Sequence, residues 1–430
     1  MATQSREFLE SLFWAAVGAA HPSRCLPPQL PDPPADGRLF VLAAGKAGGS
    51  LAEVAEQHYL ARMPASRLAG IAVTRHGYGR PTRHIEMVEA GHPVPDAAGL
   101  AGAERMLALA DAAQAGDVVL VLLSGGASAN LIAPAAGITL ADKQATTRAL
   151  LRSGANISEI NCVRKHLSRI KGGRLARRAH PASVATLAIS DVPGDDPAVI
   201  GSGPTVPDPT TLADARAIVG KYRLELPGAV ISALADPVNE SPKPGDRIFA
   251  ATTFRIIARP ADALAAARGC AEAAGYDCVV LSDRLQGEAR EVAAGHAWLA
   301  RDLAASGRRM AILSGGELTV TLKGGGRGGP NQEYALALAI HLDGAAGIAA
   351  MAADTDGTDG GRGRPDDPAG AFLDATTLAR AASAGLDPAA FLADNDSTGF
   401  FNGIGDLFTP GPTFTNVTDF RAIVVDRPPP

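Results

Sequence analysis

Residues 118–130 read VVLVLLSGGASAN and place six apolar residues directly before Ser124-Gly125-Gly126. A continuous apolar run that ends on glycine predicts a strand buried on both faces of a parallel sheet. The stretch MAILSGGELTV at 310–320 repeats the arrangement with Ser314-Gly315-Gly316. Ligands of parallel α/β sheets bind at the carboxyl ends of the strands, where glycine exposes backbone N–H groups. We therefore predict that the two tripeptides form two sides of one cleft between two domains; the alternative is that each only turns a strand into a loop.

The rest of the chain alternates between short apolar strands and helices, which is typical of α/β domains with helices on both faces of a sheet. In the first half, strands are predicted at 38–45, 68–74, 84–91, 118–123 and 184–192, and helices at 46–62, 97–113, 140–152 and 158–179. In the second half, strands are predicted at 248–257, 278–282, 310–316, 318–322, 347–354 and 420–425, and helices at 260–275, 287–306, 331–342 and 374–383. Residues 233–247 carry three prolines and few apolar side chains, so we predict two domains, 1–238 and 239–430, each with three α/β/α layers.

Composition narrows the class of protein. Apolar residues make up 46% of the 430 residues and charged residues 20%, as in ordered globular proteins. The net charge of −5 gives no general attraction for nucleic acid or anionic lipid. The four cysteines lack the spacing of a zinc site or a disulfide framework, so free thiols are expected. Glu7 and Glu10 precede the first apolar stretch, unlike a signal peptide, and no continuous apolar run reaches about 18 residues. We expect a cytoplasmic protein that binds neither membrane nor nucleic acid.

Lys46 lies in AAGKAGG (43–49), where a predicted strand ends and a helix begins. A lysine at a helix N-terminus opposes the helix dipole, so the position is unfavourable unless the charge is used, for example on a phosphate. The segment is not a Walker A loop, because Phe40 stands where the first glycine would be and Ala47 follows the lysine. A solvated surface lysine is the alternative.

The segment KGGGRGGPNQE (323–333) surrounds Arg327 with glycines, and Pro330 then opens a helix. A guanidinium on such a loop is suited to clamp a carboxylate or a phosphate with two hydrogen bonds. The same segment also fits the dinucleotide pattern G-x-G-x-x-G, so an NAD(P)-dependent reductase stays open. The preceding residues ELTVTLK alternate in polarity, unlike the buried first strand that this pattern normally follows. A simple glycine-rich turn is a further alternative.

Acidic side chains follow two other predicted strands. Asp191 ends one strand, and Asp354 and Asp356 follow another in the stretch MAADTDGTDGG. Hard oxygen ligands on loops suit Mg²⁺, which takes one or two carboxylates together with phosphate oxygens. Turns formed by Asp-Gly pairs are the alternative, and neither this stretch nor DNDSTG (394–399) completes a calcium loop. The basic stretch 161–180 is predicted to be a helix with a solvated charged face rather than a nucleic-acid site.

Several long motifs together resemble the class II glycerate kinases, the glycerate 2-kinase group, whose C-terminal half is called the MOFRL domain. The motifs are AAGKAG, LLSGGASANLIAP, INCVRKHLSRIKGGRLA, AISDVPGDDPAVIGSGPTVPD, QGEAREVA, LSGGELTVTLKGGGRGGPNQE and TNVTD. The resemblance extends from about residue 40 to about residue 420. It implies a Rossmann-like N-terminal domain, a site in the inter-domain cleft, and ATP- and Mg²⁺-dependent phosphorylation of D-glycerate to 2-phosphoglycerate. Members are also named hydroxypyruvate reductase, so NAD(P)H-dependent reduction of hydroxypyruvate remains the alternative activity.

The resemblance implies that the catalytic cations are Lys46 and Arg327. We add the hypothesis that Asp191 orients or deprotonates the substrate hydroxyl and that Asp354 or Asp356 holds Mg²⁺. The residues expected to bind nucleotide and substrate are Ser124, Gly125, Gly126, Ser128, Ser314, Gly315, Gly316, Glu317 and Asn331. Two stretches depart from the family pattern: Arg259-Pro260 and the long, basic loop 355–371. The expected partner is a small molecule, D-glycerate; a homodimer is compatible with the sequence, which does not specify the oligomeric state.

Overall fold

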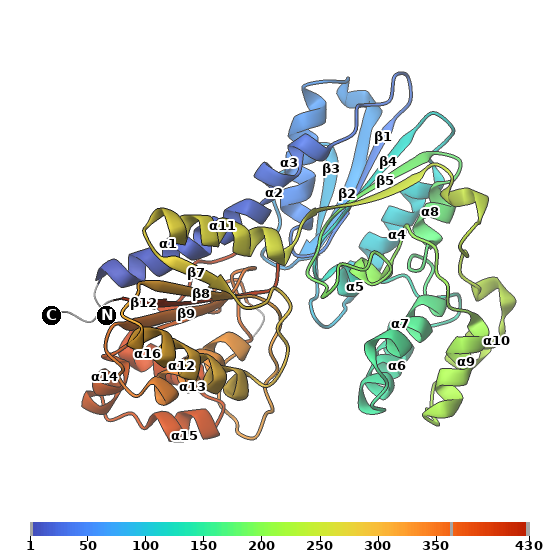
Figure 1. Cartoon of the computed structure of the whole chain (residues 1–430). Helices are drawn as coiled ribbons and strands as arrows, with labels where there is room; N and C mark the ends of the chain where they lie inside the picture. The colour runs from blue at the N-terminus through green and yellow to red at the C-terminus, as the bar shows by residue number, and fades with distance from the viewer. Residues whose placement is uncertain (1–2, 362–363, 427–430) are drawn as a thin grey trace. The chain divides into compact units, whose positions relative to one another are not determined.

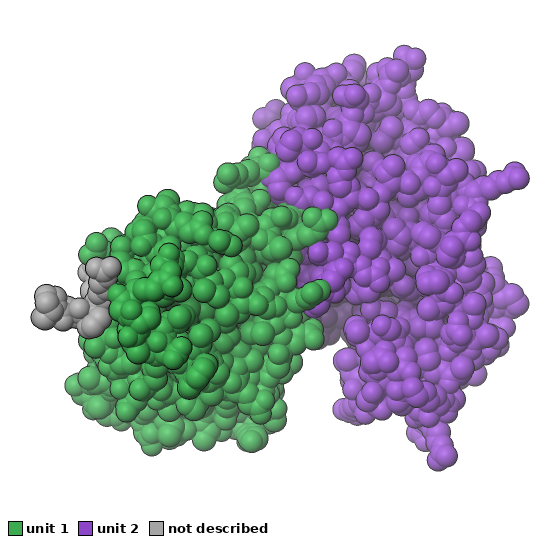
Figure 2. All heavy atoms as spheres, viewed as in Figure 1, with its two compact units in different colours: residues 1–24, 258–430 green, residues 25–257 purple. Residues whose placement is uncertain are grey.

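The computed structural model describes residues 3–361 and 364–426. Arg362 and Gly363, which belong to the loop 355–371 that departs from the family pattern, lie outside the described residues. The chain divides into two compact units (Figure 2): an N-terminal unit, Cys25–Ile257, and a C-terminal unit that combines Met1–Arg24 with Ala258–Pro430. These limits differ from the predicted boundary at 238/239. Strand β6 (Thr252–Ala258) completes the first sheet, and helix α1 (Thr3–Ala20) packs on α11 (Pro260–Ala273) of the C-terminal unit.

The N-terminal unit is built on one sheet with the strand order β3-β2-β1-β4-β5-β6. The first five strands pair in parallel, as predicted: β1 (Leu39–Ala44), β2 (Leu68–Arg75), β3 (Ile85–Ala90), β4 (Val118–Leu123) and β5 (Ser183–Ile189). This is the strand order of Rossmann folds. Successive strands are added on one side of β1 as far as β3, and from β4 onward they are added on its other side, so the order of addition reverses between the neighbouring strands β1 and β4. The expectation of a Rossmann-like N-terminal unit is confirmed.

Helices cover this sheet on both sides (Figure 1). Helix α3 (Gly48–Leu60) packs on β1 and β2, while α4 (Ala97–Asp111) buries Met106 and Leu107 against a core that includes Phe40 and Leu42. The other helices of the unit are α5 (Ala127–Asn130), α6 (Leu140–Arg152), α7 (Ile157–His166), α8 (Arg174–Ala179), α9 (Leu212–Lys221) and α10 (Gly228–Ala235). Helix α2 (Pro22–Cys25) ends at Cys25, the first residue of this unit. Short 3-10 helices span Pro27–Gln29, Ala65–Arg67, Ile200–Ser202, Pro237–Asn239 and Arg247–Phe249.

The C-terminal unit contains a mixed sheet with the order β11-β10-β9-β12-β8-β7. Its strands are β7 (Asp277–Val280), β8 (Met310–Ser314), β9 (Ile348–Asp354), β10 (Gly370–Asp374), β11 (Leu407–Phe408) and β12 (Asp419–Val425). Strand β12 is antiparallel to both β8 and β9, and β10 is antiparallel to β9. The alternation of strands and helices therefore does not produce a purely parallel sheet here, because β10 and the terminal strand insert in the opposite direction.

The mixed sheet is also a middle layer (Figure 1). Helices α1 and α11 pack on one side, and α12 (Ala289–Ala305) and α13 (Pro330–Leu342) share a core with the strands on the other. The remaining helices are α14 (Thr377–Ser383), α15 (Pro388–Ala393) and α16 (Ser397–Ile404). No helix among the described residues is long and apolar enough to cross a membrane.

Two predicted elements differ from the structure. The helix predicted at 158–179 is two helices, α7 and α8, because Gly172 and Gly173 adopt positive φ angles of 59° and 79° between them. The strand predicted at 318–322 forms only an isolated bridge between Thr319 and Glu288. Strand β10 was not predicted, because its five residues follow a long loop and resemble the beginning of the next helix.

Candidate active site

The carboxyl ends of β1 and β4 lie side by side where the strand order reverses, which is the usual ligand position in such sheets. The turns that follow them are Gly45-Lys46 and Ser124-Gly125-Gly126, and they are bonded to each other. The Lys46 amide donates to the Gly125 carbonyl over 2.7 Å, and the Ala47 amide donates to Ser124 Oγ over 2.9 Å. Gly45 has a φ of +108°, and a Cβ there would lie 2.4 Å from Ser124 Oγ, so this close approach requires glycine.

The second turn provides an opening for an anion. Gly126 adopts the left-handed conformation, with φ +83°, at the start of α5. Within residues 3–361 and 364–426, no acceptor is bonded to the amide N–H of Gly125 or Gly126. A Cβ on Gly126 would lie 2.9 Å from His92 Cδ2 and 3.3 Å from Lys46 Cγ, so both side chains flank this turn. Consecutive open amides beside a lysine form an anion nest, and we refer to Lys46, Gly125 and Gly126 as the nest.

Other predicted residues of this unit lie at the same edge of the sheet. Asp191 follows β5, the neighbour of β4, and is partly exposed. Ser128 lies two residues after Gly126; its hydroxyl is 2.8 Å from Ser202 Oγ, and its carbonyl accepts from Lys171 Nζ over 2.7 Å. The structure therefore places Asp191 at the correct edge, and its catalytic role stays a prediction.

The second Ser-Gly-Gly tripeptide, after β8, differs from the first. The Gly315 amide donates to Ser282 O over 2.8 Å, and the Gly316 amide donates to Thr418 Oγ1 over 3.3 Å. Ser314 Oγ accepts from the buried Arg421 guanidinium over 3.2 Å. These amides are already used within the protein, so of the two tripeptides only the first has open amides among the described residues; that either one binds a ligand stays a prediction. Glu317, the next residue, is exposed.

Asn331 is fully buried rather than open to a ligand. Its Nδ2 donates to Asp419 Oδ1 over 2.7 Å and to Asp359 Oδ1 over 3.2 Å. Burial, together with the charge of Asp419, raises the pKa of the Asp359 carboxyl to about 7, while hydrogen bonds from Asn331 and Gln332 oppose this rise. The two Nδ2 hydrogen bonds of Asn331 therefore join α13 to the loop after β9 and to the first residue of β12, and its ligand contact stays a prediction.

The glycine-rich loop around Arg327 is held by the acidic loop 394–398. Lys323 and Gly324 donate their amides to Asn395 Oδ1 over 2.7 and 3.0 Å, and the Arg327 amide donates to Asp396 Oδ1 over 3.0 Å. The Arg327 side chain is exposed, and no described residue forms an ion pair or hydrogen bond with its guanidinium. The loop is thus rigid at its backbone and leaves the cation available to a ligand.

The same contacts exclude a dinucleotide at this loop. A Cβ on Gly324 would lie 2.3 Å from Asp394 O, and one on Gly326 would lie 2.3 Å from Asp396 Cβ. The glycines therefore accommodate the acidic loop. The amides of Gly324, Gly325 and Gly326 donate to Asn395 Oδ1, Asp394 Oδ1 and Asp394 O, where the amides of a fingerprint loop would face a pyrophosphate. The side-chain oxygens of Asp394, Asn395 and Asp396 accept these hydrogen bonds. They are therefore already used within the protein, although the sequence of this stretch resembles a calcium-binding loop.

Comparison with known proteins agrees with this architecture. The domain of unknown function DUF4147 matches residues 8–235, and the MOFRL family matches residues 310–419. A D-glycerate 2-kinase of Thermotoga maritima is 38% identical over 94% of both chains. A protein of Agrobacterium vitis that carries the name of a hydroxypyruvate reductase is 48% identical over 98% of this chain and 94% of its own. The crystal structure of the Thermotoga maritima glycerate kinase superposes with a TM-score of 0.86, at 36% identity, over 98% of this chain and 99% of that one.

The chain belongs to the glycerate 2-kinase family. The resemblance drawn from the motifs is thereby confirmed, and so is the two-unit α/β fold that it implied.

A metal site in this glycerate 2-kinase homologue would have few ligands. Among the described residues, no group of three or more His, Cys, Asp or Glu side chains could hold an ion. Asp354 Oδ1 accepts from the Asp356 amide, and Asp356 Oδ1 accepts from the Thr358 amide and hydroxyl over 2.8 and 3.1 Å. The two carboxylates are hard oxygen donors on one turn, which fits Mg²⁺ completed by phosphate oxygens and fits zinc poorly.

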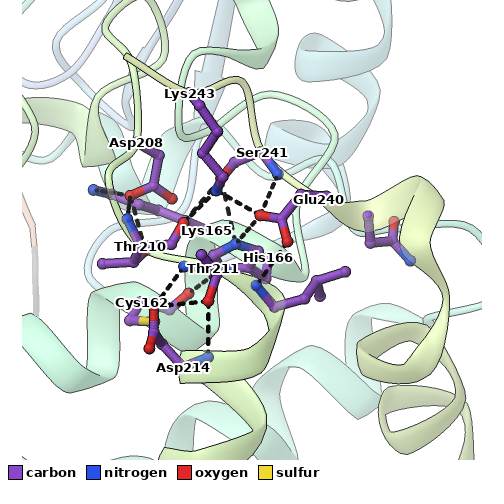
Figure 3. A network of polar contacts seen from close by, with 12 residues as sticks. Cys162, Lys165, His166, Asp208, Thr210, Thr211, Asp214, Glu240, Ser241 and Lys243 are labelled. Carbon is purple, nitrogen blue, oxygen red and sulfur yellow. Dashed lines mark hydrogen bonds and ion pairs between the residues drawn. The ribbon is translucent and has the colours of Figure 1, made fainter.

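The basic stretch 161–180 of this family member is not the solvated helix face that was predicted. His166 and Lys171 are fully buried, and Lys165 and Arg174 are nearly so. Figure 3 shows that α7 is bound to the segments 208–214 and 240–243 by this stretch: Lys165 lies 3.5 Å from Asp208, and His166 Nε2 lies 3.2 Å from Glu240 and 3.3 Å from Ser241 Oγ. The only local signal for this burial is the glycine pair, which interrupts the expected helix.

Proposed function

We propose that the chain transfers the γ-phosphoryl group of ATP to the 2-hydroxyl of D-glycerate and produces 2-phosphoglycerate. Membership of the glycerate 2-kinase family supports the reaction class, and a glycerate kinase requires a nucleotide phosphate donor. The observation that carries the proposal is the nest, where two open amides and Lys46 meet at the switch point of a Rossmann-like sheet. Phosphoryl transfer depends mainly on positioning and on neutralising charge, and this geometry supplies both.

The predicted catalytic residues and the nest each have one role in this reaction. The nest holds phosphoryl oxygens through the Gly125 and Gly126 amides, and the Lys46 ammonium balances their charge. Arg327 clamps the transferring group with its guanidinium. Asp191 accepts the proton of the 2-hydroxyl as the bond between that oxygen and the γ-phosphorus forms and the bond to the ADP oxygen breaks.

Asp354 and Asp356 are the residues that would hold Mg²⁺. Bound there, the ion supplies charge neutralisation for the phosphate oxygens. Because the C-terminal unit offers two carboxylates on one turn, we expect the nucleotide to complete the coordination.

Single substitutions of the two cations test the assignment. Lys46→Ala and Arg327→Ala are each expected to reduce kcat by about 10³-fold or more, by analogy with arginine fingers. ADP release in the presence of D-glycerate measures turnover, and phosphorus NMR identifies the product as the 2- or the 3-phosphate. Near-normal kcat in both variants would show that the transferring group lies elsewhere.

The name carried by the Agrobacterium vitis relative makes hydroxypyruvate reduction the second activity to assay. The turn after β1 reads Gly45-Lys46-Ala47-Gly48 and lacks the G-x-G-x-x-G pattern. The loop that does contain the pattern donates its amides to the Asp394 and Asp396 carboxylates. We therefore expect no loss of NADH or NADPH absorbance when the protein is mixed with hydroxypyruvate, under conditions in which it phosphorylates D-glycerate.

We further propose a cytoplasmic location, where ATP is available, and a reaction that needs no nucleic acid or membrane partner. Cell fractionation tests the location. A homodimer is compatible with this activity, and light scattering of the purified chain measures the oligomeric state.

A further inference from the structure

Lys171 is a buried lysine whose side chain joins two segments of the N-terminal unit. It has no exposed surface, and its ammonium donates to Ser128 O over 2.7 Å and to Ser202 Oγ over 3.3 Å. The two acceptor residues also contact each other, since Ser128 Oγ lies 2.8 Å from Ser202 Oγ. The three residues therefore form a closed set of polar contacts, which we call the lysine link.

The first segment is α5, the single helical turn that begins directly after the nest and contains Ser128. The Gly126 carbonyl accepts from the amides of Ala129 and Asn130 over 2.9 and 3.3 Å, so α5 and the turn after β4 form one continuous piece. A helix of four residues has little stability of its own, and its orientation depends on contacts from other segments. The bond from Lys171 to Ser128 is such a contact.

The second segment follows β5 and contains both Asp191 and Ser202. It is bonded within itself, for example by the Ile200 amide, which donates to Asp196 O over 3.2 Å. Ser202 has a φ of 63°, in the left-handed region that favours glycine. The hydroxyl that Ser202 contributes to the lysine link gives a reason for a serine at this position.

The second segment is held in place without the Lys171 side chain. The amides of Gly172 and Gly173 donate to the carbonyls of Ser202 and Gly203 over 3.0 and 2.8 Å. The backbone next to Lys171 is therefore attached to this segment already. The side chain adds the connection to α5, and through α5 to the nest.

The lack of a carboxylate distinguishes Lys171 from Lys165, a buried lysine of the same stretch. Lys165 lies 3.5 Å from the Asp208 carboxylate (Figure 3), whereas no Asp or Glu in the described part of the chain forms an ion pair with Lys171. A buried ammonium without an opposite charge lowers stability. Residues that reduce stability are typical of functional sites, which favours a catalytic over a purely structural reason for Lys171.

We propose that Lys171 is a positioning residue for phosphoryl transfer: through Ser128 it holds the nest in a fixed place relative to the segment that carries Asp191. The nest binds phosphoryl oxygens and Asp191 accepts the proton of the substrate hydroxyl, so the reaction depends on the distance between them. This catalytic consequence rests on the proposed function, whereas the connection of the two segments rests on the contacts alone.

Lys171→Met and the matched control Lys165→Met test the proposal. Lys171→Met is expected to lower kcat at least about tenfold and to leave the KM values for ATP and D-glycerate within about twofold, because positioning acts in the transition state. Its melting temperature should be no lower than that of wild type, since an uncompensated charge is removed. Lys165→Met should behave in the opposite way: its melting temperature falls, because Asp208 stays buried without its cation, while kcat below that temperature stays within about twofold.

Ser202→Gly is a second variant that is expected to fold, because glycine adopts a φ of 63° without strain. It removes one hydrogen bond of the lysine link and should lower kcat about fivefold. Hydrogen–deuterium exchange of the α5 amides gives a measurement that does not depend on activity. These amides should exchange faster in Lys171→Met and in Ser202→Gly than in wild type and in Lys165→Met.

Three results would overturn the proposal. They are a wild-type kcat in both Lys171→Met and Ser202→Gly, equal losses of kcat in Lys171→Met and Lys165→Met, or a clearly lower melting temperature of Lys171→Met, which would make the lysine structural.

Failure of the proposed function gives a different pattern. If the wild type does not phosphorylate D-glycerate, but α5 exchanges faster in Lys171→Met and Ser202→Gly alone, the lysine link stands, and the kinase assignment and the catalytic role of the link both fail. If the wild type phosphorylates D-glycerate and neither variant differs from it in kcat or exchange, the kinase assignment stands and the positioning role fails.

Discussion

Substitution of Gly126 by alanine should separate backbone strain from displacement of the catalytic lysine. Gly126 has a φ of +83°, which costs a residue with a side chain about 1–2 kcal/mol. The new Cβ would lie 2.9 Å from His92 Cδ2 and 3.3 Å from Lys46 Cγ. Ordinary contact begins at 3.4 Å, so the imidazole must move by about 0.5 Å and the lysine stem by less. Because a 1 Å misplacement of reacting groups can cost about 10²-fold in rate, we expect kcat/KM for D-glycerate to fall about tenfold.

Gly137→Ala is the matched control for this experiment. Gly137 has a φ of +79° in the same unit, but a Cβ added there would have no atom within 4 Å. Chemical denaturation should therefore show a loss of about 1–2 kcal/mol in the free energy of unfolding for both variants. The activity loss should occur in Gly126→Ala alone. If Gly126→Ala retained the kcat/KM of Gly137→Ala, the turn after β4 would not position Lys46 for catalysis.

Three further predictions concern the glycine-rich loop, the acidic loop that holds it, and Lys143 on α6. Arg327→Lys should lower kcat at least about tenfold in steady-state kinetics, because an ammonium cannot form the two parallel hydrogen bonds of a guanidinium. Since the side chain is exposed, chemical denaturation should show a change of less than about 0.5 kcal/mol in the free energy of unfolding. Asn395→Ala should lower the free energy of unfolding by about 2–3 kcal/mol and also lower kcat. The Asn395 side chain accepts from the amides of Lys323 and Gly324 over 2.7 and 3.0 Å and donates to Glu333 over 2.9 Å, so its loss releases the glycine-rich loop. A variant with the stability of wild type would contradict these contacts. Wild type should gain stability relative to Lys143→Gln as the pH rises from about 7 to about 9. The pKa of Lys143 is about 8 in the folded chain against 10.5 in the unfolded chain, so the unfolded chain binds more protons in this window. Melting temperatures across this pH range measure the effect, and a constant difference between the two proteins would show that burial does not lower this pKa.

Much of the fold follows from the sequence because it depends on local patterning. The apolar run 118–123 and the glycines after it predict a buried parallel strand with a ligand edge, and β4 has this structure. The same pattern at 310–316 predicts β8 correctly, but local patterning contains no information on the direction of its neighbours. Strand direction depends on which distant segments pair, so β12, antiparallel to β8, could not be read from its own residues.

The candidate site shows the same division. Lys46 and Arg327 are identified by their neighbours in the sequence, because a lysine at a helix start and an arginine among glycines are unusual. The sequence pattern places Asn331 at the ligand, but the tertiary structure buries it against Asp359 and Asp419. The glycines around Arg327 are typical of a phosphate loop, yet they exist because a distant acidic loop packs on them.

The sequence by itself determined the alternation of strands and helices, the parallel first sheet and the choice of Lys46 and Arg327 as candidate catalytic residues, because these follow from periodicity and from residue types in short windows. Only the tertiary structure decided which amides remain open and which cations are left without a carboxylate. Two identical Ser-Gly-Gly turns have opposite hydrogen-bonding states, and Arg164 lacks the carboxylate that its neighbour Lys165 has. The physical reason is that hydrogen-bond satisfaction and charge compensation depend on groups far apart in the chain, which only folding brings within a few ångströms of each other.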